Sequence, residues 1–363
     1  MAAAVIGEPR SGPNGGAMSV GEIERELARL RMNEDGTLGA RSSVLNLIVV
    51  TSEESAASIT PVVCELSGRY PSRAILMISD PVEEEANLEV GLSAFCGVRH
   101  RMPGGGQVCA EQITLHVEGP PAGHLESLVG PLLVPDLPVF LWYPDGEIPS
   151  SPEGGLAALA DRLILDSGAA GDCKTSLRGV ASLLRGESVP AVGDLQWAAL
   201  SPWRALVADL FAPPERAGEL GKIERVEILH SERGECRALL FAGWLSATLG
   251  WHPESAGRTE KGRELRFASH SGKVTVELAP GATEAAPSRV RLFSGECFFQ
   301  VSRYEQRADA SSSMMRGDEL VGERTVHLGS SDVDTLLGEE LRIMGRDEAY
   351  ESAVERAAMM LDL

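Results

Sequence analysis

The chain has 363 residues, of which 43% are hydrophobic and 24% are charged. This length and composition are typical of a folded globular protein with room for two domains, and they exclude an intrinsically disordered chain. The formal net charge of −20 argues against binding to nucleic acid or to an anionic membrane surface, because both need a concentrated positive patch.

Residues 1–18 are predicted to form a flexible tail, because they are rich in Gly, Ala and Pro. They lack the apolar stretch of a signal peptide. The longest apolar helix candidate, residues 238–249, is too short to cross a bilayer, so we expect a cytoplasmic protein. The first helix is predicted to begin at Ser19, where Ser-Val-Gly-Glu has the pattern of a capping box.

Two nearly continuous apolar runs, residues 44–50 and 74–78, are predicted to be strands covered on both faces. A helix with inward-facing apolar residues lies between them, so the three elements are predicted to form a right-handed parallel unit. Residues 92–100 and 112–117 are predicted to form a hairpin at the edge of the same sheet, since the second run alternates apolar and polar residues.

The central strand is predicted within residues 119–149, at Val139–Trp142. Prolines block a helix before it, and Pro-Asp-Gly at 144–146 forms a turn after it. The carboxyl end of such a strand is where sites usually form in α/β sheets. We expect the turn to present Tyr143, and part of Trp142, to solvent. The alternative is an ordinary core strand closed by a proline turn.

The second half of the chain has a different pattern, with a buried helix at 237–249 and two alternating hairpins around residues 271–272 and 294–295. The predicted fold is an α/β N-terminal domain with a mainly parallel sheet, followed by an α+β C-terminal domain with antiparallel hairpins. The predicted bounds are 1–18 for the tail, 19–168 for the α/β domain, 169–222 for a helical connector and 223–363 for the α+β domain.

Catalytic motifs are missing from the sequence, which has no H-E-x-x-H, G-x-S-x-G, Walker or dinucleotide-binding pattern. Asp136 and Asp145 flank the central strand and could act as a carboxylate pair, although turn and cap roles explain both residues more simply. The six cysteines form no C-x-x-C pair, so neither a thioredoxin-type site nor a zinc site is indicated. We expect no metal and no cofactor. Cys96 and Cys109 are the disulfide candidates, but we expect free thiols in a cytoplasmic protein.

Three segments of the sequence together resemble the glucose-6-phosphate dehydrogenase assembly protein family, OpcA. The segments are Tyr70-Pro71-Ser72-Arg73, the stretch from Gly130 to Pro144, and Asp194-Leu195-Gln196-Trp197 with Ser201-Pro202-Trp203-Arg204. Their order and spacing match, and the resemblance covers most of residues 19–350. It departs from the family pattern at Tyr143, where a second Trp is expected, at 201–202, where a Thr-Tyr pair is common, and in the glycine-rich loop at 103–106.

The resemblance implies a non-catalytic, chaperone-like partner or allosteric activator of glucose-6-phosphate dehydrogenase, the oxidative entry to the pentose phosphate pathway. Aromatic side chains and arginines are the usual anchors of protein interfaces. The candidate partner-binding residues are Arg73, Asp136, Trp142, Tyr143, Trp203 and Arg204.

An alternative from another class remains open. The chain could be an enzyme, or a module that binds a sugar phosphate or a nucleotide, with its site at the mouth of the α/β sheet. In that case Arg73 would bind phosphate and Trp142 would stack on a ring.

Overall fold

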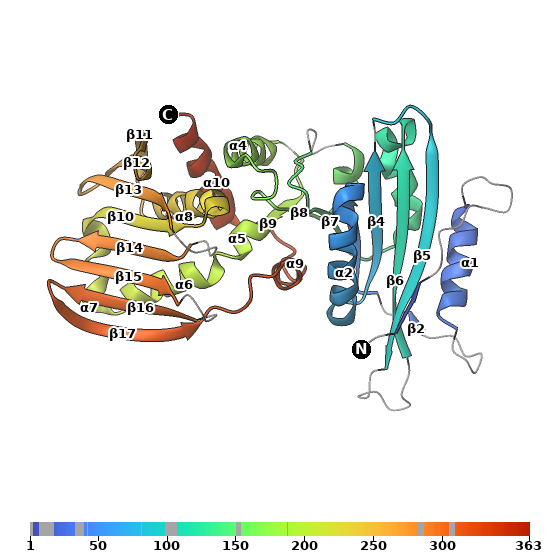
Figure 1. Ribbon diagram of the computed structural model, residues 1–363, viewed down its shortest axis with the longest axis horizontal. Helices are drawn as coiled ribbons and strands as arrows, with labels where there is room; N and C mark the ends of the chain where they lie inside the picture. Colours follow the sequence, from blue (N-terminus) through green and yellow to red (C-terminus); the bar gives the residue numbers. More distant parts are fainter. Residues whose placement is uncertain are drawn as a thin grey trace. The chain divides into compact units, whose positions relative to one another are not determined.

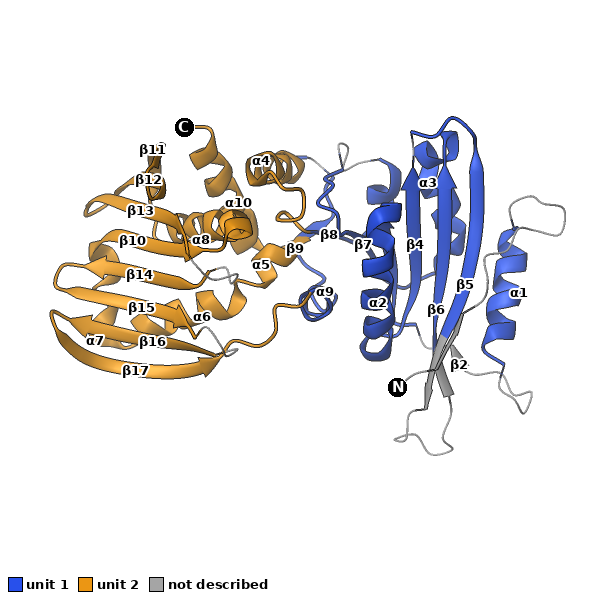
Figure 2. Cartoon of the chain, viewed as in Figure 1, with its two compact units in different colours: residues 1–165, 186–192, 333–345 blue, residues 166–185, 193–332, 346–363 orange. Residues whose placement is uncertain are grey.

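The computed structural model describes residues 3–6, 18–32, 40–41, 43–80, 82–98, 107–149, 154–186, 188–281, 287–304 and 309–363. The chain divides into two compact units, which Figure 2 shows in different colours. The first unit comprises residues 1–165, 186–192 and 333–345, and the second comprises residues 166–185, 193–332 and 346–363.

The first sheet contains nine strands in the described part of the chain, in the order β1-β5-β6-β4-β3-β7-β8-β9, with β2 paired to β6. The strands are β1 (Ala3–Ile6), β2 (Ala40–Arg41), β3 (Leu45–Thr51), β4 (Ser72–Asp80), β5 (Asn87–Val98), β6 (Gln107–Glu118), β7 (Val139–Tyr143), β8 (Arg162–Leu165) and β9 (Ala191–Asp194).

The core of this sheet is parallel, as the continuous apolar runs predict. β3 pairs in parallel with β4 on one side and with β7 on the other, and the β4–β6 and β7–β8 pairs are also parallel. β5 and β6 form the predicted antiparallel hairpin. The order β6-β4-β3-β7-β8-β9 is that of a dinucleotide-binding sheet, whose order reverses between the strands here called β3 and β7.

The prediction of a flexible tail over residues 1–18 is wrong for residues 3–6. Residues 3–6 form β1, which pairs antiparallel with β5, and residues 18–19 lead directly into α1 (Val20–Leu30). Small residues favour flexibility only while no neighbouring strand edge satisfies their backbone groups. The predicted capping box at Ser19 is confirmed, because the Glu22 carboxylate accepts from the Ser19 backbone N–H at 2.8 Å.

Helices of the first unit cover its sheet (Figure 1). Besides α1 they are α2 (Glu53–Arg69), α3 (Leu125–Val129) and α9 (Val333–Glu340), with 3₁₀ turns η1 (Pro120–His124), η2 (Gly130–Leu132) and η3 (Gly155–Leu159). Pro61 lies inside α2. After α3 the chain continues as the 3₁₀ turn η2, since Pro131 cannot continue an α-helix.

The second sheet contains eight strands in the described part of the chain, in the order β11-β12-β13-β10-β14-β15-β16-β17. They are β10 (Ile223–His230), β11 (His252–Thr259), β12 (Gly262–Ser269), β13 (Gly272–Pro280), β14 (Arg289–Ser294), β15 (Cys297–Arg303), β16 (Asp309–Arg316) and β17 (Glu319–His327). Only the β10–β13 pair is parallel, so the predicted antiparallel hairpins are confirmed.

Helices of the second unit are α4 (Cys173–Leu184), α5 (Leu195–Ala198), α6 (Ser201–Phe211), α7 (Pro214–Ala217), α8 (Glu235–Thr248) and α10 (Glu348–Leu361), with 3₁₀ turns η4 (Leu220–Lys222) and η5 (Glu232–Gly234). The apolar helix α8 packs on β10 and β13 and against α10. A Cβ at Gly243 would overlap the Ala353 carbonyl of α10, so the close packing of these two helices requires a glycine. No helix in the described ranges is long and apolar enough to cross a membrane.

Candidate functional site

At the carboxyl edge of the first sheet, where a dinucleotide-binding sheet holds phosphate, a carboxylate of the chain itself contacts the N-terminus of α2. One oxygen of Asp145, in the turn after β7, accepts hydrogen bonds from the Thr51 hydroxyl and the Ser52 backbone N–H, both at 2.9 Å. Ser52 is the N-cap of α2, and Glu53 and Glu54 occupy its first turn. The helix N-terminus therefore already has negative groups where a bound phosphate would need positive potential.

The prediction that Tyr143 and part of Trp142 face solvent is wrong. Trp142 has no exposed surface and Tyr143 is 9% exposed. β7 lies between β3 and β8, and all five of its residues are buried, so the ordinary core-strand alternative describes it better. Burial, followed by the nearby Glu147 carboxylate, raises the pKa of the Tyr143 hydroxyl to about 12.

Trp142 is expected to stabilise the fold through its ring rather than its N–H group. The indole Nε1 is buried without a hydrogen-bond partner among the described residues. We expect Trp142→Ala to lower the free energy of unfolding by about 3 kcal/mol or more, because it leaves a large cavity. Trp142→Phe should cost clearly less, since it removes an unsatisfied donor as well as volume. Denaturant unfolding of both variants checks this, and equal losses would contradict it.

Arg73 lies in a buried ion-pair network and is only 1% exposed. Its guanidinium donates to the Glu111 carboxylate at 2.6 and 3.0 Å and to the Leu132 carbonyl at 3.0 Å, and it also pairs with Glu24. Arg31 contacts the other oxygen of Glu111 at 3.0 Å. These contacts leave Arg73 little capacity to bind a phosphate group.

The other candidate residues lie in different surroundings. Asp136 is exposed and has a φ of 62°, a conformation that suits its turn. Trp203 is 2% exposed on α6. Arg204 stacks on the Trp197 ring, with its guanidinium carbon 3.3 Å from the ring centroid, and donates to the Ser201 hydroxyl at 2.9 Å. A partner-binding role for the candidate residues stays a prediction.

A buried polar network surrounds Asp194, and residue types alone did not single it out. One Asp194 oxygen caps α5 by accepting from the Gln196 N–H at 2.9 Å and also accepts from the Ser167 N–H at 3.2 Å. The other oxygen accepts from the Tyr350 hydroxyl at 3.1 Å. Burial, together with nearby Asp166, raises the pKa of Asp194 to about 6 against the lowering effect of these hydrogen bonds.

Gln196 extends this network to two more charged groups. Its amide donates to Asp166 at 2.5 Å, and its carbonyl oxygen accepts from Arg237 at 2.6 Å. Burial is the main cause that raises the pKa of Asp166 and lowers that of Arg237. Side chains with shifted pKa values can mark a catalytic site. Here, however, the hydrogen bonds of these side chains join different segments of the second unit, so we assign the network a structural role.

The expectation that the cysteines are free thiols is wrong for Cys173, Cys236 and Cys109, which are disulfide-bonded. Cys173 of α4 and Cys236 of α8 form a disulfide, with Cα atoms 5.2 Å apart, whereas Cys64 and Cys297 are free. The two residues lie 63 positions apart, so no local motif indicates the bond. Cys109, one of the two predicted disulfide candidates, is disulfide-bonded. The backbone register places it opposite Cys96, whose side chain lies outside the described residues.

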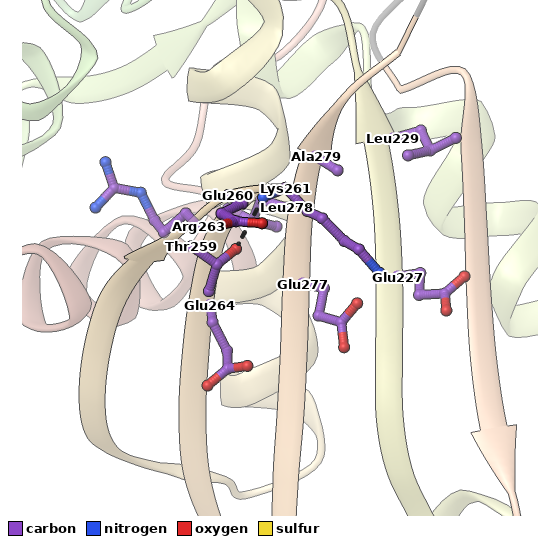
Figure 3. A pocket seen from close by; sticks show the side chains of 10 residues that line it. All are labelled: Glu227, Leu229, Thr259, Glu260, Lys261, Arg263, Glu264, Glu277, Leu278 and Ala279. Atoms are coloured by element: carbon purple, nitrogen blue, oxygen red, sulfur yellow. Dashed lines mark hydrogen bonds between the residues drawn. The ribbon is translucent and has the colours of Figure 1, made fainter.

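A charged hollow of about 540 Å³ lies on the second sheet (Figure 3). Glu227, Glu264 and Glu277 project into it from three neighbouring strands, and Lys261 reaches over it from the turn between β11 and β12. Arg263 points away and pairs with Glu235 at 2.7 Å. No cluster of three or more potential metal ligands occurs within the residues that the structure describes.

Comparison with known proteins identifies the family. Residues 63–182 match the family described as Glucose-6-phosphate dehydrogenase subunit N-terminal domain, and residues 190–354 match its C-terminal domain. The chain belongs to the OpcA family. Its resemblance segments at 194–197 and 201–204 thus fall within the matched C-terminal domain.

Relatives named OxPP cycle protein OpcA occur in Synechocystis sp. and Nostoc punctiforme. The Synechocystis sp. protein is 24% identical over 80% of this chain, and the Nostoc punctiforme protein is 30% identical over 53% of it. The chain spans 63% and 40% of the length of these two relatives. The matched family models are described as domains of a glucose-6-phosphate dehydrogenase subunit, and the relatives are named for the OxPP cycle.

Two of the solved structures that align with this chain are oxidoreductases. A 3-ketoreductase from Actinomadura kijaniata, solved with NADP and TDP-benzene, aligns with a TM-score of 0.50 at 12% identity and covers 88% of this chain and 96% of that chain. An aldose-aldose oxidoreductase from Caulobacter crescentus aligns with a TM-score of 0.44 at 12% identity and covers 88% and 98%. At this identity the likeness concerns the fold alone.

Proposed function

We propose that this chain is a non-catalytic partner of glucose-6-phosphate dehydrogenase that acts as an assembly factor or an allosteric activator. The observation that carries the proposal is the carboxylate at the carboxyl edge of the first sheet. The strand order is that of a dinucleotide-binding fold, yet the Asp145 carboxylate occupies the Ser52 N–H at the start of α2. The family to which the chain belongs supports the choice of partner.

Two further features weigh against an enzyme at this edge of the sheet. A phosphate-binding turn after β3 needs glycines so that the backbone can approach the pyrophosphate, but Thr51, Ser52, Glu53 and Glu54 stand there. Arg73 and Trp142, which would bind phosphate and a ring in the alternative function, are 1% and 0% exposed. The proposed role therefore uses the outer surface of the chain rather than this edge.

The proposal is tested by mixing the purified chain with purified glucose-6-phosphate dehydrogenase. We expect the chain to raise the rate of NADP⁺ reduction by the dehydrogenase, or to shift its assembly state, in proportion to the amount added. Albumin at the same mass concentration is the control for non-specific stabilisation. An unchanged rate together with unchanged assembly would contradict the proposal.

Ligand binding by the chain alone separates this role from the alternative. We expect neither NADP⁺ nor glucose 6-phosphate to raise its melting temperature, because the Asp145 carboxylate already contacts the N-terminus of α2. A dose-dependent rise with either compound, or NADP⁺ reduction by the chain without the dehydrogenase, would favour a nucleotide- or sugar-phosphate-binding enzyme instead.

A further inference from the structure

Helices cover one face of the second sheet, and the other face has no helix of the described chain packed on it. Helices α6, α8 and α10 pack on the strands from the same side (Figure 1). Along β10 the side chains of Val226 and Ile228 are fully buried under these helices, whereas the alternating Arg225, Glu227 and Leu229 are only partly buried. No described element covers this second face, which we call the open face.

Strand register arranges the open face in rows that cross the sheet. The middle row begins with three acidic residues, Glu264 on β12, Glu277 on β13 and Glu227 on β10. It continues with Arg291 on β14 and Gln300 on β15. The sign of the charge therefore changes between β10 and β14, which are the two central strands of the eight.

A neighbouring row carries apolar side chains on the other half of the sheet. Arg225 on β10 lies over the Phe293 ring, with its guanidinium carbon 3.9 Å from the ring centroid. The centroids of Phe293 and Phe298 are 5.9 Å apart. Met315 and Leu320 extend this row to the edge of the sheet, and Leu320 is 52% exposed.

We propose that the open face binds a second copy of this chain about a two-fold axis that runs along the strands between β10 and β14. Such an axis places each half of the face against the other half of the second copy. Glu227 then meets Arg291 of the second copy, and Arg225 meets Phe293 of the second copy. The acidic half never faces itself, so the arrangement has no like-charge contact in its middle row.

Charge balance favours a second copy as the occupant. The whole chain has a net charge of −20, so two copies repel each other over most of their surface. The three rows of the open face instead carry four arginines and four glutamates: Arg225, Arg266, Arg289, Arg291, Glu227, Glu264, Glu277 and Glu323. This part of the surface is therefore close to neutral, and in its middle row the glutamates of β12, β13 and β10 are separated from Arg291 on β14.

The open face is also large enough for a stable dimer interface. Eight strands spaced about 4.8 Å apart span about 34 Å, and three rows of alternate residues cover about 20 Å along the strands. The face therefore offers about 700 Å² on each copy, which is close to the area that each partner buries in a stable interface of standard size.

Charge reversal tests the proposal on the full chain. We expect the wild-type chain to sediment as a dimer, and Glu227→Arg and Arg291→Glu each to raise the dimer dissociation constant about a hundredfold, because each puts two like-charge contacts in the interface. An equimolar mixture of the two variants should form a heterodimer again, since opposite charges then meet at the two exchanged positions. Arg25→Glu, on exposed α1 of the first unit, is the matched control and should stay dimeric.

The mixture separates the interface from effects within one chain. Glu227 also contacts Arg225 at 2.8 Å and Arg291 at 3.7 Å inside its own chain, and mixing the two variants cannot restore those contacts.

Should a reversal variant fail to fold, Phe298→Asp provides a second test, because it places a charge in the apolar row without breaking an ion pair. A monomeric wild-type chain, or a mixture that stays monomeric, would overturn the proposal. Loss of dehydrogenase binding by a monomeric chain would assign the face to that partner instead.

Discussion

Replacing Asp194 by alanine is expected to lower the free energy of unfolding by about 3 kcal/mol at about pH 5. The variant leaves the Ser167 N–H, the Gln196 N–H and the Tyr350 hydroxyl without their shared acceptor. Each buried donor that loses its partner costs roughly 1–3 kcal/mol. Asp194→Asn keeps an acceptor oxygen and almost the same volume, so it should cost much less. Denaturant unfolding of both variants measures the difference.

Stability should also depend on pH through this carboxyl group. Its folded-state pKa of about 6 lies above the ordinary value of 3.8, so the folded chain binds the proton more tightly than the unfolded chain does. The stabilisation is fully present below about pH 4 and is lost as the pH rises through about 6. The gap of roughly two pKa units corresponds to about 3 kcal/mol.

Asp194→Asn isolates this effect from other titrating groups. Asparagine cannot ionise, so the difference in unfolding free energy between wild type and variant should change between about pH 4 and pH 6 and stay constant above about pH 7. Other carboxyl groups titrate in both proteins, and their contributions cancel in the difference. A difference that does not change with pH would show that Asp194 has an ordinary pKa.

Much of the fold could be predicted, because the spacing of apolar residues within a short segment indicates which faces of a strand are buried. In the predicted runs at 44–50 and 74–78 every residue except the exposed Val44 is buried. The alternating residues of β12–β15 form two hairpins with short turns. The pattern fails for β16, where Ser311, Ser312 and Ser313 carry no alternation and are buried only because neighbouring strands enclose them. It also fails for β11, whose side chains are mostly exposed at the sheet edge.

The surroundings of the candidate site could not be predicted, because its partners lie far apart in the sequence. Tyr350, which binds Asp194, follows it by 156 residues. The burial of Trp142 depends on β3 and β8, which enclose its strand. An arginine is rarely fully buried unless it is paired, and the sequence around Arg73 does not reveal its contact with the distant Glu111.

Replacing Arg73 by methionine is expected to cost about 3–5 kcal/mol of unfolding free energy. Methionine fills a similar volume, but it leaves Glu111, which has no exposed surface, with Arg31 as its nearest described cation. A buried charge that loses its main partner is strongly destabilising. The double variant Arg73→Met/Glu111→Gln should recover much of the loss, because it removes the uncompensated charge together with the pair. Chemical unfolding of wild type and of the single and double variants forms the required cycle.

Arg178→Met is the matched control for this cycle. Arg178 pairs with Asp362 at 2.7 Å, but the two side chains are 47% and 62% exposed. A pair so exposed contributes about 1 kcal/mol or less, so burial rather than ion pairing itself should decide the size of the effect. If Arg73→Met instead keeps its stability and loses binding to glucose-6-phosphate dehydrogenase, Arg73 acts as a partner anchor. In that case its contacts with Glu24 and Glu111 must open when the partner binds, because both of them hold the guanidinium in the free chain.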